Sequence, residues 1–83
     1  MIEIYGRPGC GYCVAAVEIC EQYQITHTYK TIQGPDDLKV IAERAGVEVT
    51  TVPQIFWYDR YVGGYNELAK EIEETRSYGQ ERI

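Results

Sequence analysis

Apolar and polar residues alternate at the start of the chain and then change to a helical repeat. Residues 2–5 alternate over four positions and end at Gly6, which is typical of a short strand. From about residue 12 to residue 23 the polar side chains share one helical face, and the opposite face carries Cys13, Ala16, Val17 and Cys20. This pattern predicts an amphipathic helix that starts at a close pair of cysteines, Cys10 and Cys13.

A second strand and a second helix follow. Residues 25–32 are rich in Thr, Ile and Tyr and end at the turn sequence Gln33-Gly34-Pro35. After Pro35, apolar residues recur at i, i+3, i+4 and i+7, namely Leu38, Ile41, Ala42 and Ala45. Gly46 stands where a helix commonly ends in the left-handed conformation. We therefore expect a helix between Pro35 and Gly46.

The next apolar stretch predicts a β-hairpin. Residues 54–58 and 61–62 flank a two-residue connection, Asp59-Arg60, and both arms are rich in strand-forming residues. The connection lacks the preferred Asn-Gly or Asp-Gly turn residues. We expect the hairpin all the same, with its turn at Asp59 and Arg60.

The C-terminal region predicts one more helix. Asn66 is a good cap for a helix from about Glu67 to Thr75, in which Leu68 and Ile72 would face inward. Residues 76–83 are expected to form a loosely held C-terminal tail.

These elements come in the order β-α-β-α-β-β-α. A helical crossover makes the first two strands parallel, and the hairpin adds two antiparallel neighbours. The fold class is therefore α/β, with a four-stranded mixed sheet flanked by three helices. A chain of 83 residues has room for one domain with its own core, so residues 1–83 are interpreted as a single domain.

Charge and targeting signals narrow the functional classes. The formal net charge is −5, with eight Lys and Arg against thirteen Asp and Glu, which disfavours binding to nucleic acid or to an anionic membrane. The start of the chain has neither the basic residues nor the apolar run of a signal peptide, and no stretch reaches the roughly 18 apolar residues needed to span a bilayer. We expect a soluble, monomeric, cytoplasmic protein.

The cysteines suggest redox chemistry. Three cysteines are too few for a secreted disulfide scaffold and odd in number, which favours a reducing compartment. Cys10 is expected in the loop just before a helix, where the helix dipole stabilises an anion by about 0.3–1 kcal/mol, and thiolate is the species that attacks disulfides. Cys13, in the first helical turn, could then close a disulfide with Cys10. The pair predicts a thiol-disulfide oxidoreductase.

A zinc site is the main alternative for these residues, because Cys10, Cys13, Cys20 and His27 supply four possible ligands. Cys13 and Cys20 would lie about 10.5 Å apart along one helix, whereas two sulfurs on one zinc ion must lie within roughly 4 Å. We therefore expect no metal at this site. Cys20 is interpreted as a small buried residue, with a redox-sensitive thiol as the alternative, and His27 as a surface or packed residue.

Three motifs then carry a family resemblance. Cys-Gly-Tyr-Cys at 10–13, Thr-Val-Pro-Gln-Ile-Phe at 51–56 and Gly-Gly-Tyr-Asn at 63–66 occur in an order and an element context that resembles the glutaredoxins. The resemblance implies a thioredoxin fold, a cis bond between Val52 and Pro53, and glutathione as reductant. It also implies an enzyme that reduces protein disulfides and protein-glutathione mixed disulfides, with ribonucleotide reductase among its candidate clients.

The resemblance also assigns roles to residues. Cys10 resembles the nucleophile and Cys13 the resolving cysteine of the dithiol, and Val52 would pair its backbone with glutathione as an added strand does. Arg7 resembles the residue that meets the glycyl carboxylate, and Glu67 could accept from the glutathione ammonium. The implied glutathione-binding residues are Arg7, Tyr12, Thr51, Val52, Pro53, Gly64, Tyr65, Asn66 and Glu67, although Asn66 is explained equally well as a helix cap.

Gly11 departs from the family pattern, since dithiol members commonly have proline between the nucleophile and the tyrosine. Some glutaredoxins without that proline hold a [2Fe-2S] cluster between two subunits, and a cluster carrier is therefore one alternative function. The other is a thioredoxin-like electron donor fed by a flavoprotein reductase.

Overall fold

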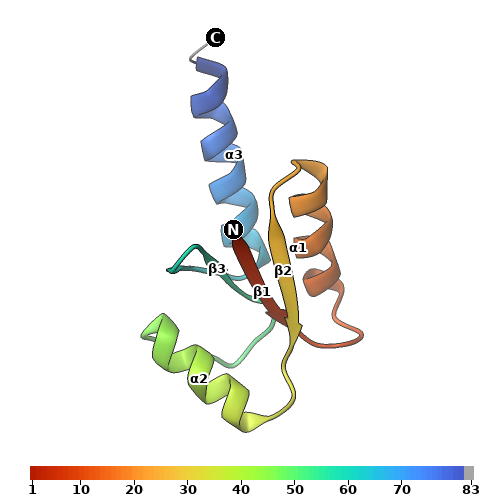
Figure 1. The fold of residues 1–83 in the computed structure, drawn as a ribbon, viewed down its shortest axis with the longest axis vertical. Coiled ribbons are helices and arrows are strands. Elements are labelled where there is room, and N and C mark those ends of the chain that lie inside the picture. Colours follow the sequence, from red (N-terminus) through yellow and green to blue (C-terminus); the bar gives the residue numbers. More distant parts are fainter. Residues whose placement is uncertain (82–83) are drawn as a thin grey trace.

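The structure is a computed structural model that describes the backbone of residues 1–81 and the side chains of residues 1–74. The elements follow the expected order, as Figure 1 shows. Their bounds are β1 (Ile2–Gly6), α1 (Gly11–Gln22), β2 (His27–Thr31), α2 (Pro35–Ala45), β3 (Gln54–Trp57), β4 (Arg60–Gly63) and α3 (Tyr65–Glu81).

The strands form one mixed sheet in the order β2-β1-β3-β4. The central strand β1 pairs in parallel with β2 and antiparallel with β3, and β3 and β4 form an antiparallel hairpin. This is the predicted α/β topology, and the prediction of parallel first strands joined by a helix is confirmed. In the part of the chain that the structure describes, each helix is too short or too polar to cross a bilayer.

Helices cover both faces of the sheet, because alternate residues of each strand point to opposite sides. Ile4 faces α1 and α3, whereas its neighbour Tyr5 faces α2. In Figure 1, α1 and α3 stand beside the strands, and α2 crosses near the end of the sheet to which β1 runs. The core under α1 and α3 contains Ile2, Ile4, Ala16, Cys20, Ile55, Leu68 and Ile72, and the core under α2 contains Ile32, Ile41, Val49 and Phe56.

The hairpin turn lies one residue earlier than predicted. Trp57 pairs with Arg60, so Tyr58 and Asp59 form the turn and Arg60 already belongs to β4. Tyr58 has a positive φ of 58°, which few non-glycine residues adopt. Its backbone N–H donates to the carbonyl of Met1 at 2.9 Å, which is a contact between chain segments far apart in sequence. The register is therefore set by tertiary pairing.

The last helix also differs from the prediction at both ends. It begins at Tyr65, so Asn66 lies inside its first turn and is not the cap. The carboxylate of Glu67 instead accepts the backbone N–H of Gly64 at 2.8 Å, as the third helical residue does in a capping box. Residues 76–81, predicted as tail, continue the helix. The attachment of this tail stays a prediction, because its side chains lie outside the described residues.

Most of the remaining helix and strand boundaries differ from the predicted ones by one or two residues. The second strand covers only His27–Thr31, whereas Ile25 and Thr26 precede it as loop. The second helix ends as predicted, with Gly46 at φ 76° in the left-handed region. The first helix begins at Gly11, one residue earlier than expected, which places Cys10 at its N-cap.

Candidate active site

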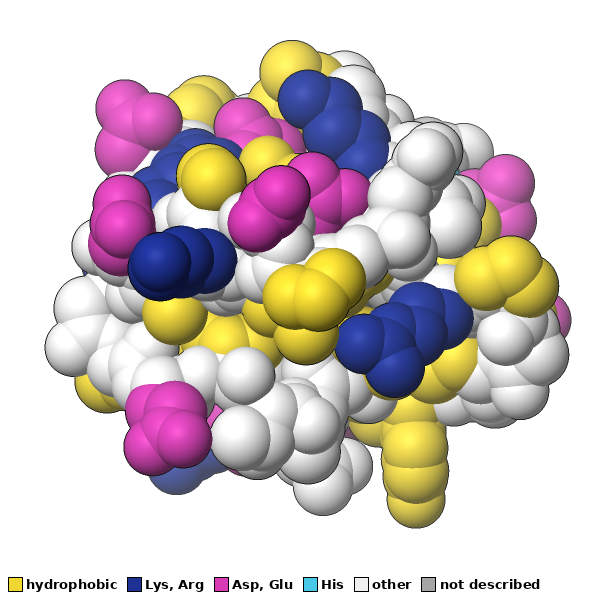
Figure 2. Space-filling view, turned by 90° about the horizontal axis from the view of Figure 1, so that it is seen from below, with side chains coloured by type: hydrophobic (Ala, Val, Ile, Leu, Met, Phe, Trp, Pro, Cys, Tyr) yellow, Lys and Arg dark blue, Asp and Glu magenta, His cyan; other side chains and the backbone are white. Residues whose placement is uncertain are grey.

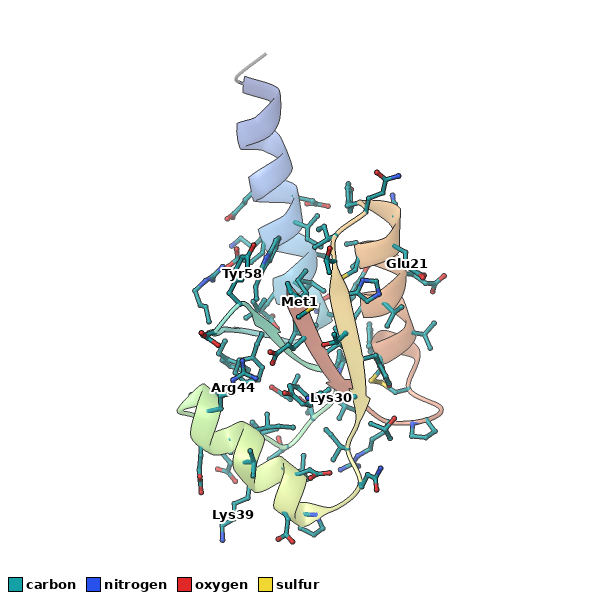
Figure 3. All side chains as sticks on the ribbon, in the orientation of Figure 1. Met1, Glu21, Lys30, Lys39, Arg44 and Tyr58 are labelled. Atoms are coloured by element: carbon teal, nitrogen blue, oxygen red, sulfur yellow. A yellow bond between two sulfur atoms is a disulfide. The ribbon has the colours of Figure 1, made fainter. Side chains whose placement is uncertain are left out.

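Cys10 and Cys13 form a disulfide across the first turn of α1. Their Cα atoms lie 5.2 Å apart, and Figure 3 shows the sulfur pair at the end of α1 that follows the loop from β1. Cys10 is partly exposed, whereas the side chain of Cys13 is fully buried. The predicted contrast between an outer and an inner sulfur is therefore present in the structure.

The helix start stabilises negative charge on the outer sulfur. Cys10 has an extended backbone, with φ −95° and ψ 111°, and its sulfur accepts the backbone N–H of Cys13 at 3.1 Å. The first N–H groups of a helix have no intrahelical acceptor, so a thiolate at the N-cap gains both a hydrogen bond and the favourable helix dipole. When the disulfide is reduced, Cys10 is the sulfur that this geometry prepares for attack.

Gly6 allows α1 to approach the sheet at the active site, a role that sequence reasoning missed. A side chain added at Gly6 would begin 2.7 Å from the sulfur and 3.0 Å from the Cβ atom of Cys13. Any Cβ there would push α1 away from β1. The sequence signal was the glycine at the end of the first strand, which was interpreted only as a strand terminus.

A groove of about 190 Å³ lies beside the cysteines. Tyr12 forms part of its wall, and the loop before β3 and the start of α3 form the rest. The lining residues are Tyr12, Thr51, Val52, Pro53, Gly64, Tyr65, Asn66 and Glu67, which are eight of the nine residues expected to bind glutathione. The Val52–Pro53 peptide bond is cis, as the resemblance implied.

The backbone of Val52 is open to a ligand. Among the described residues, neither its N–H nor its C=O has a hydrogen-bond partner. Pro53, which follows, has no N–H to donate. An extended peptide in the groove could therefore pair with Val52 as an additional strand.

The glycine pair at the start of α3 leaves room for the Glu67 carboxylate. Gly63 has a φ of 122°, a conformation that favours glycine. A Cβ atom at Gly63 would lie 3.0 Å from Oε1 of Glu67 and 3.1 Å from its Cγ. Because Gly63 and Gly64 lack side chains, Glu67 folds back over the helix start and lies at the groove.

Gln54 supports the groove wall from below, whereas the sequence analysis used it as a strand and motif residue and gave it no role in the site. It is 4% exposed, and its Nε2 atom donates to the carbonyl of Thr51 at 2.8 Å and to the Thr51 hydroxyl at 3.3 Å. The Tyr61 hydroxyl donates to its Oε1 atom at 2.6 Å. Burial raises the pKa of Tyr61, and the negative charge of Glu67 raises it further, so the Tyr61 hydroxyl keeps the proton that it donates. A polar residue within an apolar strand was the available signal.

Comparison with known proteins agrees with this geometry. The glutaredoxin family model matches residues 2–62. Glutaredoxin 1 of Escherichia coli (strain K12) is 36% identical over 81 residues, covering 87% of this chain and 92% of the relative.

The chain belongs to the glutaredoxin family. The solved structure of reduced Escherichia coli glutaredoxin is similar, with a TM-score of 0.78 and 33% identity over 92% of this chain and 96% of that one. A buckwheat glutaredoxin solved in complex with glutathione shares the fold, with a TM-score of 0.67 and 21% identity over 89% of this chain and 69% of that one. The thioredoxin fold is thus confirmed, and the cysteine pair makes this glutaredoxin a thiol-disulfide oxidoreductase.

Arg7 is the one predicted binding residue that does not line the groove of this glutaredoxin. It is exposed in the loop between β1 and α1, three residues before Cys10. Tyr12 is 65% exposed, and its ring centroid lies 6.0 Å from that of Tyr65. Two neighbouring tyrosine rings therefore line the groove, whereas Arg7 does not.

The third cysteine is separate from this site. Cys20 is a fully buried free thiol, and burial raises its pKa to about 11. The prediction that it is a small core residue is confirmed. His27 is half-buried, with its Nδ1 atom 2.9 Å from the carbonyl oxygen of Ile25. Across the described residues, no group of three or more His, Cys, Asp and Glu side chains is placed to hold a metal ion.

Proposed function

We propose that this glutaredoxin reduces protein disulfides and protein-glutathione mixed disulfides, with glutathione as the reductant. The observation that carries the proposal is the groove beside the cysteines, in which the open backbone of Val52 lies between Thr51 and the cis-proline Pro53. Glutathione is a short extended peptide with one sulfur, so its cysteinyl unit could pair with Val52 while its sulfur bonds to Cys10.

The charges around the groove suit the two ends of glutathione. The start of α3 offers helix N–H groups to the carboxylate of the γ-glutamyl residue, and the Glu67 carboxylate can accept from its ammonium group. Arg7, exposed in the loop three residues before Cys10, is the cation that we propose for the glycyl carboxylate. Seen from below, the molecule shows basic, acidic and hydrophobic side chains interspersed on one surface (Figure 2), so local positive charge is present although the net charge is −5.

The same cysteines serve both reactions. With a protein-glutathione disulfide, the Cys10 thiolate attacks the glutathione sulfur and the protein thiolate leaves, and a second glutathione then releases oxidised glutathione. With a protein disulfide, Cys10 forms a mixed disulfide with the protein, and Cys13 attacks Cys10 to release the reduced client. Two molecules of glutathione then reduce the Cys10–Cys13 disulfide.

We further propose that the protein works as a monomer in the cytoplasm, with ribonucleotide reductase among its candidate clients. An odd cysteine number and the free thiol of Cys20 beside one redox pair suit a reducing compartment. The [2Fe-2S] alternative stays an untested prediction.

A coupled assay tests the choice of reductant. NADPH consumption is followed with a low-molecular-weight disulfide as substrate, in the presence either of glutathione and glutathione reductase or of thioredoxin reductase alone. We expect turnover only in the glutathione system, with the Cys10→Ser variant as the blank. Turnover with thioredoxin reductase and none with glutathione would instead support the thioredoxin-like electron donor.

A further inference from the structure

Tyr29 of β2 places its hydroxyl group beside the buried sulfur of the active site. Tyr29 pairs with Ile4 in the sheet, so its side chain lies on the face that α1 covers. The point where a side chain on Gly6 would begin is 2.7 Å from the Cys13 sulfur, and the Tyr29 hydroxyl oxygen is nearer still to the same point. The hydroxyl and the sulfur are therefore neighbours across the bare backbone of Gly6.

The hydroxyl is only weakly held in the disulfide state. Its acceptor is the carbonyl oxygen of Arg7, at 3.4 Å. Hydrogen bonds from a hydroxyl to oxygen are usually about 2.5–3.0 Å long. Turning this O–H toward another acceptor would therefore cost little.

The inner sulfur needs such a donor once the disulfide opens. Cys13 is fully buried, and burial disfavours a thiolate, which is the form that must attack Cys10. The helix N–H that supports negative charge in this turn points to Cys10 and not to Cys13. The segments packed around Cys13 also carry other titratable side chains, namely Cys10 and Arg7 in the preceding loop, Tyr12 on α1 and Tyr65 on α3. Of the described groups near this turn, the Tyr29 hydroxyl shares with the Cys13 sulfur the close approach to Gly6.

We propose that the Tyr29 hydroxyl donates a hydrogen bond to the Cys13 sulfur in the reduced protein and thereby positions the resolving thiolate. This inference rests on the proposed role of Cys13 as the resolving cysteine. During resolution the Cys13 sulfur bonds to the Cys10 sulfur, the bond between Cys10 and the client sulfur breaks, and the client leaves as a thiolate. Tyr29 keeps its own proton throughout, and the proton of the Cys13 thiol goes to solvent.

The direct test measures the ionisation of Cys13 without glutathione. In the Cys10→Ser background, the rate of alkylation by iodoacetamide is followed against pH, and peptide mass spectrometry counts only the Cys13 adduct. Tyr29→Phe should raise the pH midpoint of alkylation by about one unit, which is the effect of losing one hydrogen bond to a charged sulfur. Tyr5→Phe is the matched control, because Tyr5 packs on the opposite face of β1, and it should leave the midpoint unchanged.

A purely structural tyrosine predicts a different result. Phenylalanine keeps the ring, so the alkylation midpoint would be the same with and without the hydroxyl, and that outcome would overturn the proposal. In the Cys10-containing protein, Tyr29→Phe should slow reduction of protein disulfides about 5- to 10-fold near neutral pH and leave deglutathionylation within about twofold, since the latter does not need Cys13. Because the alkylation assay contains no glutathione, it remains valid even if the proposed reductant is wrong.

Discussion

The backbone N–H of Cys13 points at the sulfur of Cys10 over 3.1 Å, while the sulfur of Cys13 is itself fully buried. The start of α1 therefore places its two cysteines in different environments. The Cys10 sulfur accepts a hydrogen bond, lies at the positive end of the helix dipole and is partly exposed to solvent. The Cys13 sulfur is buried, and it lies close enough to bond to Cys10. This asymmetry leads to the first prediction.

The two cysteines should divide the reactions between them. Cys10→Ser should abolish both deglutathionylation and reduction of protein disulfides, because it removes the attacking sulfur. Cys13→Ser should retain deglutathionylation, since free glutathione can release the glutathione bound to Cys10, but little reduction of protein disulfides, where release depends on an intramolecular thiol. Both activities are measured for each variant under a glutathione-regenerating system. If Cys13→Ser loses both activities and Cys10→Ser keeps either one, the roles are reversed.

Arg7→Ala should weaken the use of a glutathionylated peptide. Loss of a charge-assisted contact of roughly 1–2 kcal/mol corresponds to about a 5- to 30-fold fall in kcat/KM. Lys39→Ala is the control, because Lys39 is an exposed cation on α2, which covers the other face of the sheet. Steady-state kinetics at low salt make the comparison. Equal kinetics for the two variants would remove Arg7 from the binding site.

Cys20→Ala should leave exchange activity nearly unchanged and lower the free energy of unfolding, because it removes a buried sulfur from the core. The pH dependence gives a second measurement. The folded-state pKa of Cys20 is raised to about 11, so between about pH 9 and 11 the unfolded chain releases this proton while the folded chain keeps it. The thiol therefore favours folding less as pH rises through this window. Denaturant titrations should show a shallower loss of stability with pH in Cys20→Ala than in the parent, and equal slopes would contradict the assignment.

Gln54→Leu should weaken substrate binding in the groove more than it slows the chemical step. The variant leaves the Thr51 carbonyl and the Tyr61 hydroxyl without their partner, at a cost of about 1–3 kcal/mol in the free energy of unfolding. Because Thr51 then loses its support, we expect KM for glutathionylated substrate to rise with little change in kcat. Tyr61→Phe removes only one of these hydrogen bonds and should have the smaller effect. A stability loss with unchanged KM would make Gln54 a structural residue only.

The sequence by itself determined the order of the elements, the faces of the helices and the place of the cysteine pair. Alternation in residues 2–5, the spacing of Leu38 and Ile41, and the glycine after α2 are local signals, since each acts over a few neighbouring positions. The family resemblance added nine candidate glutathione-binding residues. Eight of those nine do lie together, because the loop before β3 and the start of α3 meet beside Tyr12.

Only the tertiary structure decided the features that depend on residues distant in the chain. The hairpin turn lies one residue earlier than predicted, because Trp57 pairs with Arg60 and the Tyr58 N–H donates to the Met1 carbonyl. The predicted cap Asn66 is not the cap, because the Glu67 carboxylate accepts the Gly64 N–H. The neighbourhood of Gly6, Tyr29 and Cys13 joins β1, β2 and α1 at one point. No local sequence pattern predicts such a contact, because the contact exists only after the sheet has formed and the helix has packed on it.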